Sequence, residues 1–203
     1  MQKFPESFNI YAKIPNLIIG FHGCTEETYN KVILEGESLK SGVSKSDWLG
    51  RGLYFWEFNL ARAWSWAETQ AEKHKTKPAV IGAIIDLGLC LNLTEEWCIK
   101  ELSLSYEGYI RLKKLVGEKI PANKDIEVDG DELYRPLDYE VIEYLHNSRI
   151  TANAQSYDSV RGIFRVEGEQ VYPTAGIRAK SHIQICIRNP NCIKGYFTPL
   201  PLK

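Results

Sequence analysis

The sequence predicts an α+β domain, and three patterns along the chain support this fold class. Short apolar runs typical of strands occur near both ends of the 203-residue chain. Stretches with helical periodicity separate them, and a largely helical insertion is expected at about 90–150. No internal repeat or flexible linker divides the chain. We therefore expect one domain, 1–203, in which strands from both ends meet in one sheet around a cleft.

The first half of the chain is expected to alternate strands and helices. In order, the predicted elements are a strand at 16–23, a helix at 25–36, a strand around Tyr54, a helix at 58–74 and a strand at 78–86. Thr25 and the acidic residues after it are typical of a helix N-terminus, and Gly36 is typical of a helix end. The run at 78–86 is apolar almost throughout, which indicates a buried strand.

The second half begins with helices and returns to strands. The predicted elements are a helix from the cap at Thr94 to about Leu115, a charged connection at 117–136, a helix at 137–149 and strands at 160–166, 182–188 and 192–197. In the strand at 182–188, alternation places His182, Gln184 and Cys186 on one face and isoleucines on the other. Buried polar side chains need hydrogen-bond partners, so this polar face indicates a structural or functional role for these residues.

The composition is that of an ordinary globular protein and argues against several functional classes. Hydrophobic residues make up 44% and charged residues 25% of the chain, and the formal net charge is −1. A net charge so close to zero does not favour nucleic-acid binding that is dominated by electrostatic attraction. No apolar stretch approaches the roughly 20 residues of a membrane span. The N-terminus lacks the apolar core of a secretory signal, so we expect a cytoplasmic protein without a membrane partner.

Cysteine and histidine usage indicates free thiols and no metal site. The five cysteines lie inside apolar segments, which fits a reducing cytosol. Cys24 is the exception because it follows His22-Gly23 in the expected cleft, where a reactive thiol is one interpretation. No Cys-x-x-Cys or His-x-x-x-His occurs. No Gly-x-Gly-x-x-Gly follows a strand, so a Rossmann mode of dinucleotide binding has no support.

The most informative motifs are His22-Gly23, at the end of the first strand, and the segment Gly50-Arg51-Gly52-Leu53-Tyr54-Phe55. A glycine lets backbone N–H and C=O groups reach a ligand amide, because it has no Cβ. A histidine offers a hydrogen bond to a sugar hydroxyl, and aromatic side chains can enclose a flat ring. The two motifs together therefore indicate a site for a ring that carries a carboxamide.

These motifs resemble the diphtheria-toxin and poly(ADP-ribose)-polymerase branch of the ADP-ribosyltransferases. A third segment, Tyr157-Asp158-Ser159-Val160, is similar to one that precedes the last donor-site strands in many mono-ADP-ribosyltransferases. The resemblance covers about 14–70 and 155–198, and the stretch from about 90 to 150 has no counterpart. It implies split mixed or antiparallel β-sheets around an NAD cleft, with NAD as co-substrate and no metal.

The resemblance also assigns residues to the donor site. Gly23 would pair with the nicotinamide carboxamide, His22 would contact the ribose, and Tyr54 and Trp64 would stack on the nicotinamide ring. Gly52 and Arg51 would lie beside them, with Arg51 clamping the diphosphate. The alternatives are a core role for His22, Tyr54 and Trp64, a tight turn at Gly23 and a solvated Arg51. Trp66 is expected to face elsewhere, in the core.

The third catalytic position departs from the family, which carries a Glu on the late strand. Gln184 is our candidate for its equivalent, as an uncharged ribose hydrogen-bonder, and the alternative is a structural glutamine. Glu167 or Glu169, in the preceding loop, could instead supply a carboxylate as general base. The alternative for both is a solvated turn.

The resemblance implies a mono-ADP-ribosyltransferase that transfers ADP-ribose from NAD to a protein or nucleic-acid acceptor. A bacterial or phage-related toxin or defence factor, with an antitoxin or immunity protein as partner, would fit a stand-alone domain of this size. Two alternatives stay open. One is a catalytically silent module that binds NAD or ADP-ribose, and the other is an NAD glycohydrolase in which water replaces the acceptor.

Overall fold

The computed structural model describes residues 17–42, 47–128, 132–164 and 170–200, and side chains at 125–128 and 132–133 are not described. In chain order the elements are β1 (Ile18–Thr25), α2 (Glu26–Tyr29), the π-helical turn η1 (Asn30–Leu34), β2 (Leu53–Glu57), α3 (Leu60–His74), β3 (Pro78–Ile85), β4 (Cys90–Asn92), α4 (Glu96–Val116), β5 (Lys124–Val128), β6 (Glu132–Tyr134), α5 (Pro136–Thr151), β7 (Ser159–Phe164), β8 (His182–Ile187), the 3-10 turn η2 (Pro190–Cys192) and β9 (Ile193–Phe197).

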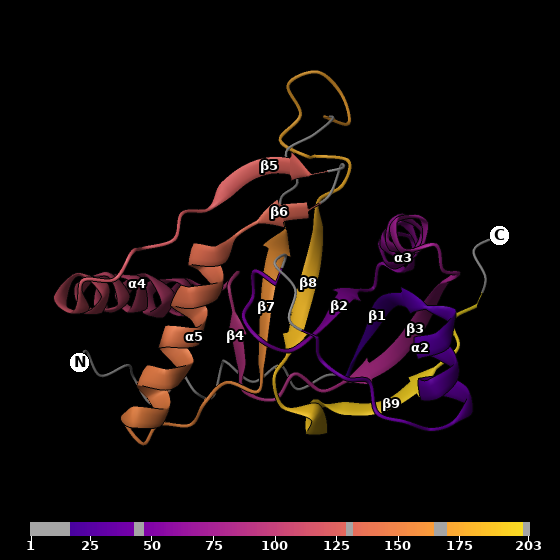
Figure 1. Ribbon diagram of the computed structural model, residues 1–203, viewed down its shortest axis with the longest axis horizontal. Helices are drawn as coiled ribbons and strands as arrows, with labels where there is room; N and C mark the ends of the chain where they lie inside the picture. Colours follow the sequence, from indigo (N-terminus) through magenta and orange to yellow (C-terminus); the bar gives the residue numbers. More distant parts are fainter. Residues whose placement is uncertain (1–16, 43–46, 129–131, 165–169, 201–203) are drawn as a thin grey trace.

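Seven of the described strands form one mixed sheet in the order β4-β7-β8-β2-β1-β3-β9 (Figure 1). Only β4 and β7 pair in parallel; the other neighbours are antiparallel. The α+β class is thus confirmed, and strands from both ends of the chain do meet in one sheet. β5 and β6 form a separate two-stranded hairpin.

The two separate sheets that the resemblance implies are hydrogen-bonded into one, which corrects that expectation. The connection is narrow, however. β1 pairs with β2 only at Gly20↔Glu57 and Phe21↔Trp56, whereas β1 and β3 are paired over the whole of β1. The sheet therefore consists of two halves, β4-β7-β8-β2 and β1-β3-β9, that share a short seam.

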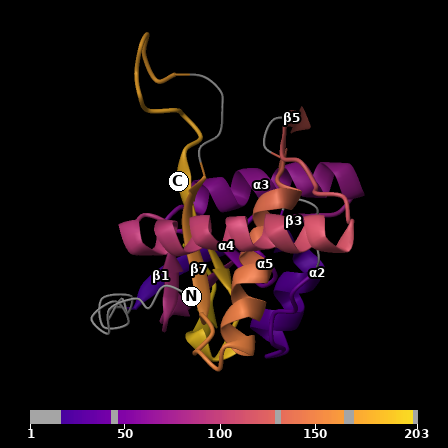
Figure 2. The same cartoon turned by 90° about the vertical axis from the view of Figure 1, so that its left-hand side faces the viewer.

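Helices cover the two halves separately (Figures 1 and 2). α3 packs on β1 and β3 through Ala63 and Ala67, which join Trp56 and Val80 in one apolar cluster. At the other end of the sheet α4 crosses α5, and α5 contributes Ile142 and Leu145 to a second cluster, shared with β7 and β8. The region between α3 and α5 lies over β2 and β8, the strands that carry the predicted site residues Tyr54 and Gln184.

The alternation of β2 and β8 explains why the site residues share one side of the sheet. Leu53 and Phe55 of β2 join the core cluster that contains Ile185 and Ile187. Tyr54 and Cys186 belong to the opposite cluster. The predicted alternation of β8 is confirmed, because its isoleucines at 185 and 187 and its Cys186 enter different clusters.

The structure also corrects several predicted elements. The helix expected at 25–36 is the short α2, capped by Thr25 as predicted, followed by η1. The cap of α4 is Glu95, within the predicted helix start Thr94-Glu95-Glu96, and its carboxylate accepts a hydrogen bond from the Cys98 N–H. β4 and the β5–β6 hairpin were not predicted, and the hairpin lies within the expected connection at 117–136. No helix in the described ranges is both long and apolar enough to cross a membrane.

Candidate functional site

The backbone of Gly23 faces the place where β1 and β2 separate. The Ile19 carbonyl accepts a hydrogen bond from the Phe58 N–H at 3.0 Å, so odd-numbered residues of β1 direct their backbone groups toward β2. Among the described residues, strand pairing across this seam ends at Phe21↔Trp56. Gly23, two residues further, keeps its β3 neighbour Val80 but has no paired residue in β2. One backbone N–H and one C=O are therefore directed into the gap.

His22 spans this gap through its side chain. Its Nδ1–H donates a hydrogen bond to the Tyr54 carbonyl at 2.8 Å, and its ring lies 5.7 Å from the ring of Phe55. Burial lowers the pKa of His22, and the hydrogen bond to Tyr54 opposes this only in part. His22 is therefore neutral near pH 7. Since Nδ1 carries the proton, Nε2 is left as a hydrogen-bond acceptor.

Gly23 is also required by the close approach of α3. A Cβ at this position would lie 2.4 Å from the Ala63 carbonyl oxygen and 3.2 Å from Cδ1 of Trp66. Trp66 in turn lies 5.9 Å from the ring of Trp56. Trp66 packs against a core cluster, as expected, but it does not face away from the site, because it lies beside Gly23. Trp64 packs against the same apolar cluster, and its stacking on a ligand stays a prediction.

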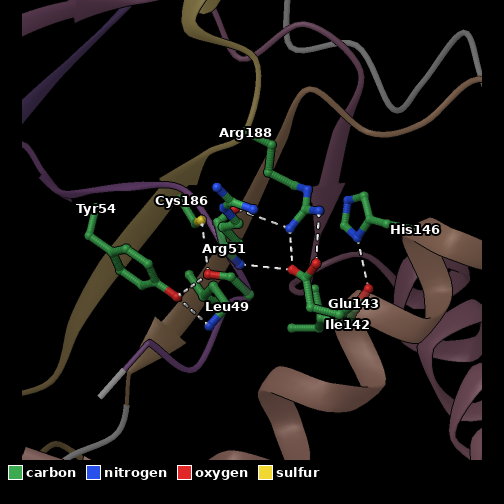
Figure 3. A network of polar contacts seen from close by, with 9 residues as sticks. Leu49, Arg51, Tyr54, Ile142, Glu143, His146, Cys186 and Arg188 are labelled. Atoms are coloured by element: carbon green, nitrogen blue, oxygen red, sulfur yellow. Dashed lines mark hydrogen bonds and ion pairs between the residues drawn. The ribbon is translucent and has the colours of Figure 1, made fainter. Parts of the chain in front are cut away.

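The hydroxyl of Tyr54 is bound to the turn that precedes β2 (Figure 3). It donates to the Gly50 carbonyl and accepts from the Leu49 N–H, both at 2.8 Å. Burial, helped by the neighbouring Cys186 thiol, raises the pKa of Tyr54 far above its usual range. Both hydrogen bonds of the hydroxyl are made within the protein, so the aromatic ring is the part of Tyr54 that a ligand could contact.

The same turn is fixed from the other side by an ion pair between α5 and the end of β8 (Figure 3). Glu143 forms a bidentate pair with Arg188, and its Oε1 also accepts the Arg51 N–H at 2.8 Å. Burial alone would raise the pKa of Glu143, but the hydrogen bonds from Arg188 and Arg51 outweigh it and leave the pKa lowered. The Arg51 carbonyl accepts from Arg188 at 3.1 Å.

The Arg51 side chain is exposed at the rim of a pocket of about 520 Å³. The pocket is lined by Leu39, Ser41, Arg51, Gly52, Leu53, Ser156, Tyr157, Asp158, Ile187, Arg188, Asn189 and Pro190. Gly52 is needed for the fold itself, because a Cβ there would lie 2.5 Å from the Cys186 sulfur and from the Ile187 carbonyl oxygen. The pocket thus lies at the start of β2 and the end of β8, and its lining includes neither His22, Gly23 nor Tyr54.

Gln184 is hydrogen-bonded to Trp48 and to neither His22 nor Tyr54. Its Oε1 accepts from the indole N–H at 2.6 Å. Along the sheet it is paired with Trp56, two residues from the Cys186–Tyr54 pair. The structure therefore brings His22, Gly23 and Tyr54 together and places Gln184 one step further along β2. Glu167 and Glu169 lie outside the described residues.

Cys24 and the Tyr157-Asp158-Ser159 segment have structural surroundings. Burial raises the pKa of the Cys24 thiol to about 12, which argues against a reactive thiol. Tyr157 donates to Glu101 of α4, and Ser159 donates to the Leu87 carbonyl at 2.7 Å. The Asp158 carboxylate accepts from the Leu89 N–H and from the Asn189 side chain. This segment joins β7 to its neighbours on both sides.

The sequence did not identify the roles of Trp48, Glu143 and Arg188. Glu143 lies in the helical insertion and is 45 residues from Arg188, so no local pattern connects them. For Trp48 a signal existed, because Gln184 on a buried strand needs a partner and an indole N–H is a donor.

Comparisons with protein-family models, with curated proteins and with solved structures found no match. Within the described ranges, no three His, Cys, Asp or Glu side chains form a group that could hold a metal ion.

Proposed function

We propose that this chain is an NAD-dependent mono-ADP-ribosyltransferase that transfers one ADP-ribose unit to a protein or nucleic-acid acceptor. The observation that carries the proposal is the seam at Gly23. A carboxamide has one donor and one acceptor side, and the N–H and C=O that Gly23 directs into the gap match it. Residue 23 itself adds no side chain there, because α3 leaves no room for a Cβ.

The remaining residues fit the other parts of NAD. The Tyr54 ring and the tryptophans of α3 provide aromatic surface for the nicotinamide ring. Nε2 of neutral His22 can accept a hydrogen bond from a ribose hydroxyl. Arg51, exposed at the pocket rim, suits the diphosphate. In the reaction the bond between nicotinamide and the anomeric carbon breaks, and nicotinamide leaves with the bonding electrons. The acceptor nucleophile forms a new bond to that carbon and releases its proton to the solvent.

A second candidate is a module that binds NAD or ADP-ribose without turnover. It is favoured by Gln184, which carries no charge and is already bonded to Trp48. Three described carboxylates beside this half of the sheet are also committed, since Glu57, Glu101 and Glu143 each pair with an arginine.

The deciding experiment is incubation of the protein with NAD labelled in its adenylate phosphate, in the presence of separate protein, RNA and DNA pools. We expect label on one pool and stoichiometric nicotinamide release. The His22→Ala variant should lose at least about 100-fold in rate, as expected when transition-state contacts are removed. Free ADP-ribose without macromolecular label would indicate a glycohydrolase, and binding without nicotinamide release would indicate the silent module.

A further inference from the structure

The turn Trp48-Leu49-Gly50 contacts both Tyr54 and Gln184, although these residues come from different strands. At one end Leu49 and Gly50 hold the Tyr54 hydroxyl. At the other end the Trp48 indole N–H donates to Gln184 Oε1 at 2.6 Å, across 136 residues of sequence. One short segment therefore sets the position of two of the candidate site residues.

The chemistry of this contact defines how the Gln184 amide is oriented. An indole N–H is a donor only, so the amide atom that faces it must be the oxygen. The amide nitrogen then points away from Trp48. Nε2 has no hydrogen-bond partner among the described residues and is not one of their buried unpartnered atoms, and the side chain is only partly buried. Its N–H donors are therefore available to a ligand.

The Trp48 ring is itself closely packed. Its Cη2 would lie 2.7 Å from a Cβ built on Gly162 of β7, so that glycine provides the space for the ring. The ring also lies 5.3 Å from that of Phe164. A ring packed in this way has little freedom to turn its N–H away from Gln184.

We propose that Trp48 is a positioning residue that fixes Gln184 with its NH₂ group toward the ligand, so that β8 offers a hydrogen-bond donor where a carboxylate would offer an acceptor. This inference rests on the proposed function. The ligand atom facing Gln184 is then an oxygen with a free lone pair, such as a ribose hydroxyl oxygen. Gln184 does not remove a proton from the molecule that accepts ADP-ribose.

The test combines one structural and one kinetic readout. In ¹H–¹⁵N spectra the Trp48 indole signal, assigned by its loss in Trp48→Phe, should exchange slowly with solvent and should lose this protection in Gln184→Leu. In NAD turnover, Trp48→Phe and Gln184→Leu should each lower kcat by about 10-fold with little change in KM, as for one oriented hydrogen bond. The double variant should be no slower than either single variant. Trp97→Phe, at an exposed tryptophan of α4, is the matched control and should keep wild-type kcat.

The Gln184→Glu variant tests whether residue 184 must donate a hydrogen bond to the ligand or only fill its position on β8. Its carboxylate can still accept from Trp48, so indole protection should persist, but the group facing the ligand becomes an acceptor and kcat should acquire a new acidic limb in its pH profile. Fully additive losses in the double variant, or an indole that exchanges freely in the wild type, would overturn the positioning role. A wild type that protects the indole but does not cleave NAD would reject the proposed function and with it the role of Gln184 toward NAD.

Discussion

The two halves of the sheet are stabilised in different ways. In the half β4-β7-β8-β2, the ion pairs Glu143–Arg188, Glu57–Arg161 and Glu101–Arg149 tie strands and helices together, and each of their side chains is at most 22% exposed. In the half β1-β3-β9, the pairs Glu26–Lys77, Glu27–Lys31 and Asp86–Lys194 have side chains that are at least 45% exposed.

Close packing accompanies these exposed pairs in the β1-β3-β9 half, and it also occurs at Gly52 and Gly162 in the other half. A Cβ at Gly23 would contact the α3 backbone, and a Cβ at Gly82 would lie 2.4 Å from the ring of Phe197. Close packing of this kind tolerates almost no added volume, whereas ion pairs tolerate volume but not the loss of a partner. The candidate site lies at the seam, with Gly23 supplied by one half and Tyr54 and Gln184 by the other.

The largest effect is expected for Gly23→Ala. The new Cβ would lie 2.4 Å from a backbone oxygen that belongs to a buried residue of α3, so the helix must move. We expect the free energy of unfolding to fall by about 3 kcal/mol or more in urea denaturation. Gly195→Ala in β9 is the matched control, because nothing lies within 4 Å of its Cβ. An equal loss in both variants would show that packing against α3 is not the cause.

Next in size is the pH dependence of stability caused by His146. Burial, with Arg188 contributing, lowers its pKa from about 6.5 to about 4, and Nε2 is a buried atom without a partner among the described residues. Between these values the unfolded chain binds more protons than the folded one. The contribution of His146 to the free energy of unfolding is thus fully present above pH 6.5. It is lost as the pH falls toward 4, by on the order of 3 kcal/mol.

Urea denaturation at several pH values measures this slope, and His146→Phe should reduce it and leave the part that the lowered pKa of His22 contributes. The control is His74→Gln, at an exposed position of α3, which should leave the slope unchanged. An unaltered slope in His146→Phe would contradict the assignment.

The ion pairs of the two halves should differ when one partner is removed. Arg188→Met leaves the Glu143 carboxylate largely buried with only the Arg51 N–H, and we expect a loss of about 2 kcal/mol in unfolding free energy. Lys77→Met breaks the exposed pair with Glu26 and should cost less than about 1 kcal/mol. Similar losses in both variants would remove the contrast between the halves.

The last stability prediction concerns Tyr54. Tyr54→Phe removes the two hydrogen bonds to the turn before β2 and should cost about 1–2 kcal/mol. Because the ring and not the hydroxyl faces a ligand, turnover of NAD should fall less than about 10-fold, whereas Tyr54→Ala should lose at least about 100-fold. Equal losses in the two variants would assign a direct role to the hydroxyl.

Much of the sheet could be predicted from apolar runs, and the exceptions are instructive. The strand β4 has three residues, too few for a periodic pattern, and the β5–β6 hairpin lies in a charged stretch. His22, Gly23 and Tyr54 could be proposed as site residues because each lies in a local motif. The contact of Gly23 with α3 and the Trp48–Gln184 bond depend on tertiary packing, which no local pattern encodes.

The position at which a nicotinamide-like ligand binds is the most direct test of the proposed donor site. Benzamide should stabilise the protein thermally, because it binds only the folded state, and it should shift the Gly23 amide signal in a saturable way. A complex structure should show its carboxamide hydrogen-bonded to the N–H and C=O of Gly23, with the ring against Tyr54 and the tryptophans of α3. A bound carboxamide away from residue 23, or thermal protection without any shift of the Gly23 amide, would contradict the central claim that the β1–β2 seam is the donor site.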